Sequence, residues 1–115
     1  MARIPERLQV GPYRYDIEVS TETIDAEAVE SGMGLPGTYA GRHLPSRGKV
    51  LLAEIDSPDY LAETLLHEVL HAVIFSCGLR DLGDDEERVV ATMTPTLLDT
   101  LRRQPELVAY LLDPE

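Results

Sequence analysis

Apolar and polar residues alternate with a period of two over the first part of the chain. Two such segments, residues 8–10 and 13–19, lie on either side of Gly11 and Pro12. A period of two places every second side chain on the same face of a β-strand, and a Gly-Pro pair favours a turn. The pattern therefore predicts a β-hairpin with one face in the core.

The following segment predicts a short crossing and two further strands. Residues 21–31 mix apolar with acidic side chains, and we expect a short helix or an irregular crossing there. Glycines and a proline indicate a loop at 32–37. We expect strands at 38–42 and 49–55, joined by a turn through 45–48.

After residue 57 the hydrophobic period becomes that of a helix. Ser57 or Asp59 can cap this helix, Pro58 suits its first turn, and Gly78 is a natural position just after its end. Apolar residues cover most of its circumference, which indicates that the helix lies inside the domain. Only one narrow stripe of it is polar.

Two further helices are expected after an acidic connector at 81–85. Apolar residues recur at helical spacing over 89–101, although Pro95 must kink this helix or start a new one capped by Thr94. Pro105 opens a last short helix. We predict a single α+β domain spanning residues 1–115. Its short, mostly antiparallel sheet of about three to four strands packs beside the buried helix and a C-terminal helical segment.

Composition limits the classes of function. The formal net charge of -11 at pH 7 makes nucleic acid or an anionic membrane an unexpected partner. No apolar run reaches membrane-spanning length, and residues 1–12 lack the apolar core of a signal peptide. The one cysteine, Cys77, allows no internal disulfide. We therefore expect a cytoplasmic protein that binds neither nucleic acid nor membrane.

The polar stripe of the first long helix contains the pattern His-Glu-x-x-His, formed by His67, Glu68 and His71. Two histidines four residues apart point the same way and can bind one zinc ion through their ring nitrogens. Glu68 is turned too far to be a good ligand, but it can reach a water on the metal as general base. A fortuitous pair of buried histidines would require neither this glutamate nor the apolar residues around the motif.

A catalytic zinc usually has three protein ligands and one water. A histidine six residues after His71 would supply the third ligand from the same helix, but Cys77 stands there. Cys77 would face the wrong side, and we expect it to be a small buried core residue. His43 lies in a turn-rich stretch, where an imidazole is more often solvated than a ligand.

Two adjacent acidic residues, Glu86 and Glu87, lead into the second helical pattern. A carboxylate at the start of a helix packed against the first one is well placed to complete a His-His-Glu site. Helical geometry permits either residue, and acids favour the first turn of a helix whatever their function. The residue pattern therefore leaves both open as third ligand.

The chain resembles the small zincin-type metallopeptidases common in phage and prophage genomes. More distantly, it is similar to the zinc peptidases that cleave repressors of mobile elements. Residues 64–73, 86–90 and 101–107 carry the resemblance, which covers about half the chain from Leu51 onward. It implies a short sheet beside the metal helix and a glutamate on the following helix as third ligand. The family pattern of a glutamate, any residue and two apolar residues matches 87–90, so we expect Glu87, with Glu86 as the alternative.

The expected function is that of a zinc-dependent metallopeptidase acting on a peptide or protein. His67, His71 and Glu87 would hold Zn2+, and Glu68 would take a proton from the activated water. The remaining donor to the carbonyl oxygen is not identified by the sequence.

For that donor the sequence offers two candidates, Tyr39 and His43. A free edge of the sheet, next to the strand at 49–55, would hold an extended peptide by strand addition. Exposed apolar residues on the last helix would indicate a homodimer.

Other functions remain open at this point. The main alternative is a non-catalytic phage assembly or interaction module that retains a structural metal site. A zinc hydrolase acting on RNA, or a peptidase recruited to DNA, would be expected to carry a third histidine ligand or a basic surface, and this chain has neither. A further alternative is an enzyme whose site stays shut until a partner opens it, with the acidic connector at 81–87 as control point.

Overall fold

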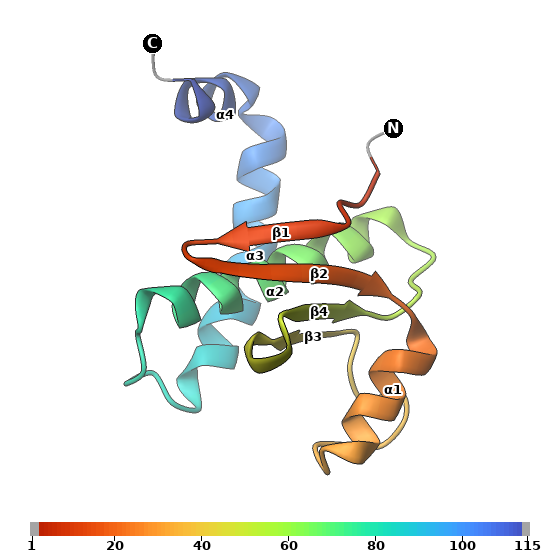
Figure 1. Cartoon of the computed structure of the whole chain (residues 1–115). Coiled ribbons are helices and arrows are strands. Elements are labelled where there is room, and N and C mark those ends of the chain that lie inside the picture. Colours follow the sequence, from red (N-terminus) through yellow and green to blue (C-terminus); the bar gives the residue numbers. More distant parts are fainter. Residues whose placement is uncertain (1–2, 114–115) are drawn as a thin grey trace.

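The computed structural model describes residues 3–113, which form one mixed sheet and several helices (Figure 1). The strands are β1 (Arg7–Val10), β2 (Tyr13–Val19), β3 (Gly41–Leu44) and β4 (Lys49–Leu52). The α-helices are α1 (Thr21–Glu30), α2 (Pro58–Cys77), α3 (Asp85–Arg103) and α4 (Pro105–Leu112). A short 3-10 helix, η1 (Pro45–Arg47), joins β3 to β4. The predicted α+β fold class is confirmed.

The strands lie in the order β1-β2-β4-β3, so that β1 and β3 form the two edges of the sheet. β1 pairs with β2, and β3 with β4, in antiparallel orientation, whereas β2 and β4 are parallel. The sheet is therefore mostly antiparallel, as expected. The strand predicted at 49–55 is an interior strand, and the free edge near it belongs to β3.

Two strands are shorter than, or displaced from, their predicted ranges. β3 begins at Gly41 rather than 38, because Thr38 closes a turn with Leu35, whose backbone N–H donates to the Thr38 hydroxyl. β4 ends at Leu52 rather than 55. Beyond it the chain leaves the ladder, since the Glu54 N–H donates to the hydroxyl of Thr21 at the start of α1.

The bounds of α2 follow the predicted signals. The Ser57 hydroxyl accepts from the N–H of Tyr60 at 3.2 Å, and Gly78 ends the helix in the left-handed conformation with φ 71°. The alternative cap, Asp59, instead contacts Arg102 of α3, with Oδ1 and Nη1 2.8 Å apart. Ser57 is therefore the cap.

α3 continues through Pro95 without starting a new helix. The Thr94 hydroxyl donates to the Val90 carbonyl at 2.6 Å, within the same helix. The expectation that Thr94 might cap a new helix is therefore wrong, because this side chain is already bonded one turn back and is fully buried.

The core lies between the sheet and α2. Tyr15, Val50 and Leu52 from the sheet pack against Ala72 of α2. Leu51 points to the opposite face, where α1 contacts β4. α3 covers α2 on its other side, so α2 lies between the sheet and α3. The buried residues of α2, Thr64, Glu68 and Ala72, nevertheless form one stripe along the helix. The remaining apolar residues of α2 are partly exposed.

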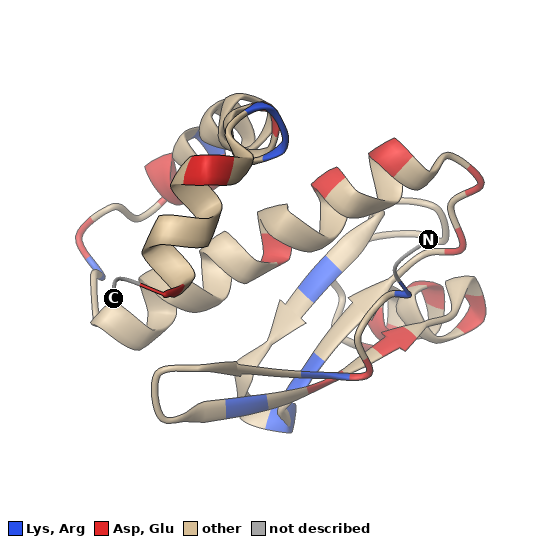
Figure 2. Ribbon diagram, turned by 90° about the horizontal axis from the view of Figure 1, so that it is seen from above, with Lys and Arg blue, Asp and Glu red and all other residues tan. Residues whose placement is uncertain are grey.

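Figure 2 shows how charge is distributed over these layers. Basic residues lie on the strands and on α3, and the more numerous acidic residues are spread over the helices, the loops and strand β2. The far end of α3 and the whole of α4 extend away from the sheet (Figure 1). Within residues 3–113, no helix has both the length and the apolar character needed to cross a membrane.

Candidate metal centre

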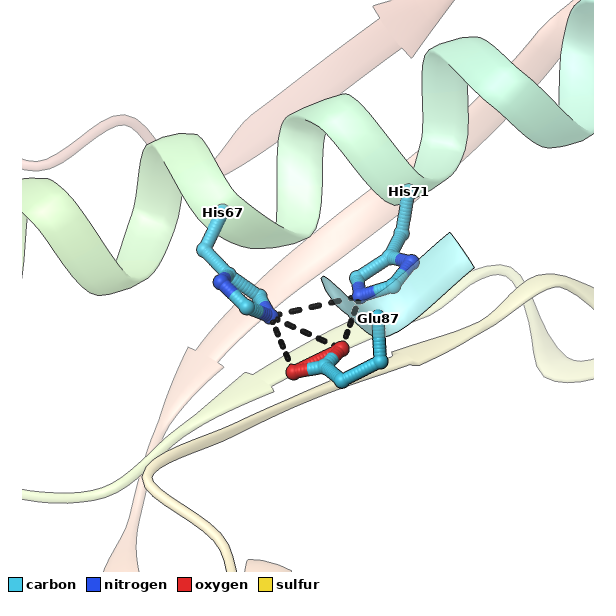
Figure 3. A group of neighbouring side chains, drawn as sticks. All are labelled: His67, His71 and Glu87. Atoms are coloured by element: carbon cyan, nitrogen blue, oxygen red, sulfur yellow. Dashed lines mark hydrogen bonds and ion pairs between the residues drawn. The ribbon is translucent and has the colours of Figure 1, made fainter. Parts of the chain in front are cut away.

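Two helices bring together, beside the edge strand β3, three side chains that could hold a metal ion. His67 and His71 lie one turn apart on α2, and Glu87 reaches them from the first turn of α3 (Figure 3). The two Nε2 atoms are 3.2 Å apart. The Glu87 carboxylate lies 2.9 Å from Nε2 of His67 and 2.7 Å from Nε2 of His71.

The distance between the two nitrogens suits a small ion with tetrahedral coordination, whereas the carboxylate oxygens lie at hydrogen-bond distance from them. Two nitrogens bound at about 2.05 Å in a tetrahedral arrangement are about 3.3 Å apart, close to the 3.2 Å between His67 and His71. One atom from each of His67, His71 and Glu87 lies within 4.8 Å of the other two. Two imidazoles and one carboxylate are a typical donor set for zinc.

Glu86 contacts the opposite side of the His71 ring. Nδ1 of His71 donates to Oε2 of Glu86 at 2.6 Å. Loss of the hydrogen at Nε2 would leave the hydrogen at Nδ1 donated to Glu86 and a lone pair on Nε2 that faces the cluster. Burial alone would lower the pKa of His71, but the hydrogen bonds with Glu86 and Glu87 raise it above its ordinary value. Glu86 therefore orients His71, and Glu87 is the carboxylate that faces both histidines.

Glu68 lies beside this cluster with only 5% of its surface exposed. Burial raises its pKa to about 7, the nearby Glu87 adds to the increase, and His71 and Arg42 act against it. An ideal β-carbon added to Gly41 of β3 would lie 2.8 Å from Oε2 of Glu68. The absence of a side chain at Gly41 therefore gives the Glu68 carboxylate its place against the edge strand.

The cluster opens into a cavity of about 400 Å³. Its lining combines α2, α3 and β3 and consists of Tyr39, Gly41, Arg42, His43, His67, Glu68, His71, Glu86 and Glu87. Hollows continue from it in both directions, one reaching Tyr60 and Glu63 and the other reaching Phe75 and Arg80. Since Glu87 has 65% of its side chain exposed, solvent reaches the cluster.

His43 differs from its expected place in a solvated loop. It lies on β3 opposite Val50, whose side chain is in the core between sheet and α2, so His43 faces the same way. Its Nε2 lies 2.8 Å from the hydroxyl of Tyr15. Burial, assisted by the charge of His71, lowers the pKa of His43 to about 4 against the opposing effect of Glu86. The expectation was wrong because β3 extends to Leu44, two residues beyond its predicted end, and includes His43.

Cys77 is exposed, so the expectation of a buried core residue is wrong. It is the last residue of α2, directly before the helix ends at Gly78. The sheet does reach this end of the helix, where the ring of Phe75 packs against those of Tyr13 and His43. Cys77 lies two positions after Phe75 and is therefore rotated about 200° around the helix, away from the sheet.

Arg42 is a residue of the cavity that sequence reasoning did not identify. Its Nη1 lies 2.6 Å from Oε1 of Glu27 on α1, in a buried ion pair. Its guanidinium also lies 4.6 Å from the ring centre of Tyr39. The sequence around Arg42 does not indicate a place in the cavity, because its partner Glu27 lies 15 positions away on α1.

Comparisons with protein-family models, with curated proteins and with solved structures found no match to this chain. The likeness to small zincin-type metallopeptidases therefore stays a prediction from the sequence motifs.

Proposed function

We propose that this protein is a zinc-dependent metallopeptidase. The observation that supports this most strongly is the convergence of His67, His71 and Glu87, with Glu68 beside them, in one open cavity. Zinc bound by the three residues would supply a Lewis acid that makes water nucleophilic near neutral pH. Among the described residues only these three groups converge, which favours a catalytic site over a structural site closed by four protein ligands.

Glu68 carries out the proton transfers in this proposal. It accepts the proton of the attacking water and later gives it to the nitrogen of the leaving amine. Burial raises the pKa of Glu68 to about 7 in the absence of metal, and a bound zinc ion would favour the carboxylate that accepts the proton. Glu86 holds the His71 ring in one tautomer and one orientation.

β3 is the part of the fold that fits an extended peptide substrate. It is an edge strand, and Gly41, Arg42 and His43 line the cavity. A peptide that adds to this edge through main-chain hydrogen bonds would pass in front of the His-His-Glu cluster. The hollows on both sides of the cluster provide room for residues before and after the cleaved bond.

The variant Glu68→Gln tests this function directly. Glutamine has nearly the shape of glutamate but accepts no proton, so we expect hydrolysis of a mixed peptide library to fall by about 100-fold or more with zinc still bound. Glu106→Gln on α4, which makes the same change far from the cavity, is the control. Hydrolysis by zinc-loaded Glu68→Gln at the parent rate would contradict the mechanism. A zinc-loaded parent that cleaves no peptide would favour the non-catalytic interaction module.

A further inference from the structure

We propose that His43 is a further catalytic residue, which donates a hydrogen bond from Nδ1 to the carbonyl oxygen of the peptide bond being cleaved. This inference rests on the proposed peptidase function. It supplies the carbonyl donor for which the sequence offered two candidates, and it follows from the hydrogen bonding of three side chains.

Tyr15 is buried, with 2% of its surface exposed. Its hydroxyl lies 2.8 Å from Nε2 of His43 and has no other hydrogen-bond partner among residues 3–113. A buried hydroxyl left without an acceptor costs about 1–3 kcal/mol. Tyr15 therefore donates to Nε2, which can accept only when it carries no hydrogen. The neutral ring then has its hydrogen at Nδ1.

Nδ1 of His43 lies on the side of the ring that is away from Tyr15. The His43 ring is held between two aromatic rings, with centroids 5.1 Å from Tyr15 and 5.7 Å from Phe75. No hydrogen bond from another described residue reaches Nδ1. Within residues 3–113, the only fully buried side-chain nitrogen and oxygen atoms without a hydrogen bond are the two that form the Glu27–Arg42 ion pair. Nδ1 of His43 therefore reaches solvent, and the ring lines the cavity that contains the metal cluster.

The other side chains in the cavity that could donate to the carbonyl oxygen already have partners. The Tyr39 hydroxyl donates to the Met33 carbonyl at 2.9 Å, so its hydrogen is already used. The Arg42 guanidinium is held by the Glu27 carboxylate through Nη1 and lies over the Tyr39 ring, so its position is set by these two residues. A ring nitrogen that carries a hydrogen cannot bind a metal, so His43 is not a fourth ligand. Of the candidate donors in the cavity, His43 has an N–H group free for a substrate.

A donor fixed in advance and aimed at a developing negative charge lowers the barrier without reorganising during the reaction. Loss of one such donor reduces kcat by about 100- to 1000-fold. The substrate also uses main-chain contacts along β3, so KM should change much less. Tyr15 acts through His43 and is a positioning residue, and its loss should have a smaller effect.

The tautomer of His43 can be measured in zinc-loaded protein by two-bond proton–nitrogen NMR correlation of the imidazole. We expect the hydrogen at Nδ1 in the parent, and a mixture of tautomers in Tyr15→Phe. A hydrogen at Nε2 in the parent would overturn the proposal, and this result does not depend on any enzyme activity.

Kinetics of zinc-loaded variants provide the second test. His43→Phe and His43→Gln should lose about 100-fold or more in kcat with zinc per chain unchanged, and Arg47→Gln, a nearby change outside the cavity, should keep the parent rate. Two different variants guard against a failure of one to fold. An active parent whose rate survives in both His43 variants would overturn this proposal alone. A zinc-loaded parent that cleaves nothing would contradict the proposed function and, with it, this role.

Discussion

Adjacent glutamates have different roles in this site because they lie about 100° apart around α3. Glu87 faces Nε2 of both histidines, while Glu86 accepts a hydrogen bond from Nδ1 of His71. A partner on the far nitrogen typically contributes a factor of about 10 to 100 to metal affinity. The distinction depends on the position of His71 between the two carboxylates.

We therefore expect Glu86→Gln to weaken zinc binding by about 10- to 100-fold, with one zinc still bound at saturation. Glu87→Gln should weaken it further, because it alters a ligand. Competition with a chromophoric chelator gives both affinities. A larger loss for Glu86→Gln than for Glu87→Gln would exchange the two roles.

The pKa of His43 predicts a dependence of stability on pH. Burial holds this pKa at about 4 in the folded chain, against an ordinary value of 6.5. Between these values the unfolded chain binds a proton that the folded chain does not, so the free energy of unfolding falls as pH decreases from about 6.5 to about 4.

The change in unfolding free energy between pH 7 and pH 5 should therefore be smaller in His43→Phe than in the parent. The ring is only half-buried, so solvent screening reduces the difference to the order of 1 kcal/mol. Urea unfolding of the metal-free proteins at both pH values measures it, and the comparison cancels groups that titrate in both. An equal change in the two proteins would contradict this account of His43.

At the residue scale the sequence identified His67, Glu68 and His71 because helical spacing is local. It could not choose between Glu86 and Glu87, since that choice depends on how α3 lies against α2. It missed Arg42 and misplaced His43 for the same reason. The neighbours that define their roles, Glu27 and Tyr15, are 15 and 28 positions away.

At the scale of elements, the close approach of β3 to α2 determines the shape of the site. Gly41 makes this approach possible, because a β-carbon there would lie 2.8 Å from Oε2 of Glu68 and 3.0 Å from Cγ2 of Thr64. A contact of 2.8 Å essentially never occurs for a real β-carbon, so the Glu68 carboxylate or one of the two elements would have to move. The proposed general base would then leave its place against the edge strand.

We expect Gly41→Ala to lower the free energy of unfolding by about 1–3 kcal/mol and to reduce peptide hydrolysis per folded molecule. The control is Gly32→Ala, where a β-carbon meets nothing within 4 Å but φ is 73°. That variant should lose about 1 kcal/mol through backbone strain and keep the parent rate. Urea unfolding and a peptide assay distinguish them, and full activity of Gly41→Ala would show that β3 does not constrain Glu68.

Element boundaries were predictable where a local signal exists. Ser57 and Gly78 define α2 through hydrogen bonding and backbone conformation at its own ends. The ends of β3 and β4 are set by contacts between distant segments, such as the bond from the Ala53 N–H to the Ala40 carbonyl. Alternation along one strand contains no information about that pairing.

At the scale of the whole molecule, the proposed zinc would join two helices that belong to different parts of the fold. α2 packs on the sheet, whereas α3 contacts the remainder mainly through α2 and extends away from it (Figure 1). A ligand that binds only the folded state stabilises it by about 2.7 kcal/mol at a free concentration of 100 times its Kd. Zinc should therefore stabilise the attachment of α3.

We expect added zinc to raise the Tm of the parent, and a chelator to reverse the increase. His71→Ala should show no increase, because it lacks one of the two nitrogens. Thermal unfolding followed by circular dichroism measures both. An equal shift in parent and variant would mean that zinc acts elsewhere on this acidic chain.

α4 presents exposed apolar side chains, Leu107, Tyr110, Leu111 and Leu112. This is the condition under which the sequence indicated a homodimer, and the homodimer stays a prediction. Sedimentation velocity over a range of protein concentrations decides it. A single monomeric species throughout that range would contradict the prediction.

The amount of zinc per chain shows whether His67, His71 and Glu87 form one zinc site. Elemental analysis of protein purified without added metal should give about one zinc per chain for the parent and for the control His43→Gln. The same analysis should give almost none for His71→Ala. A parent with no zinc, and none after incubation with it, would contradict the claim and leave the two histidines as ordinary side chains of the fold.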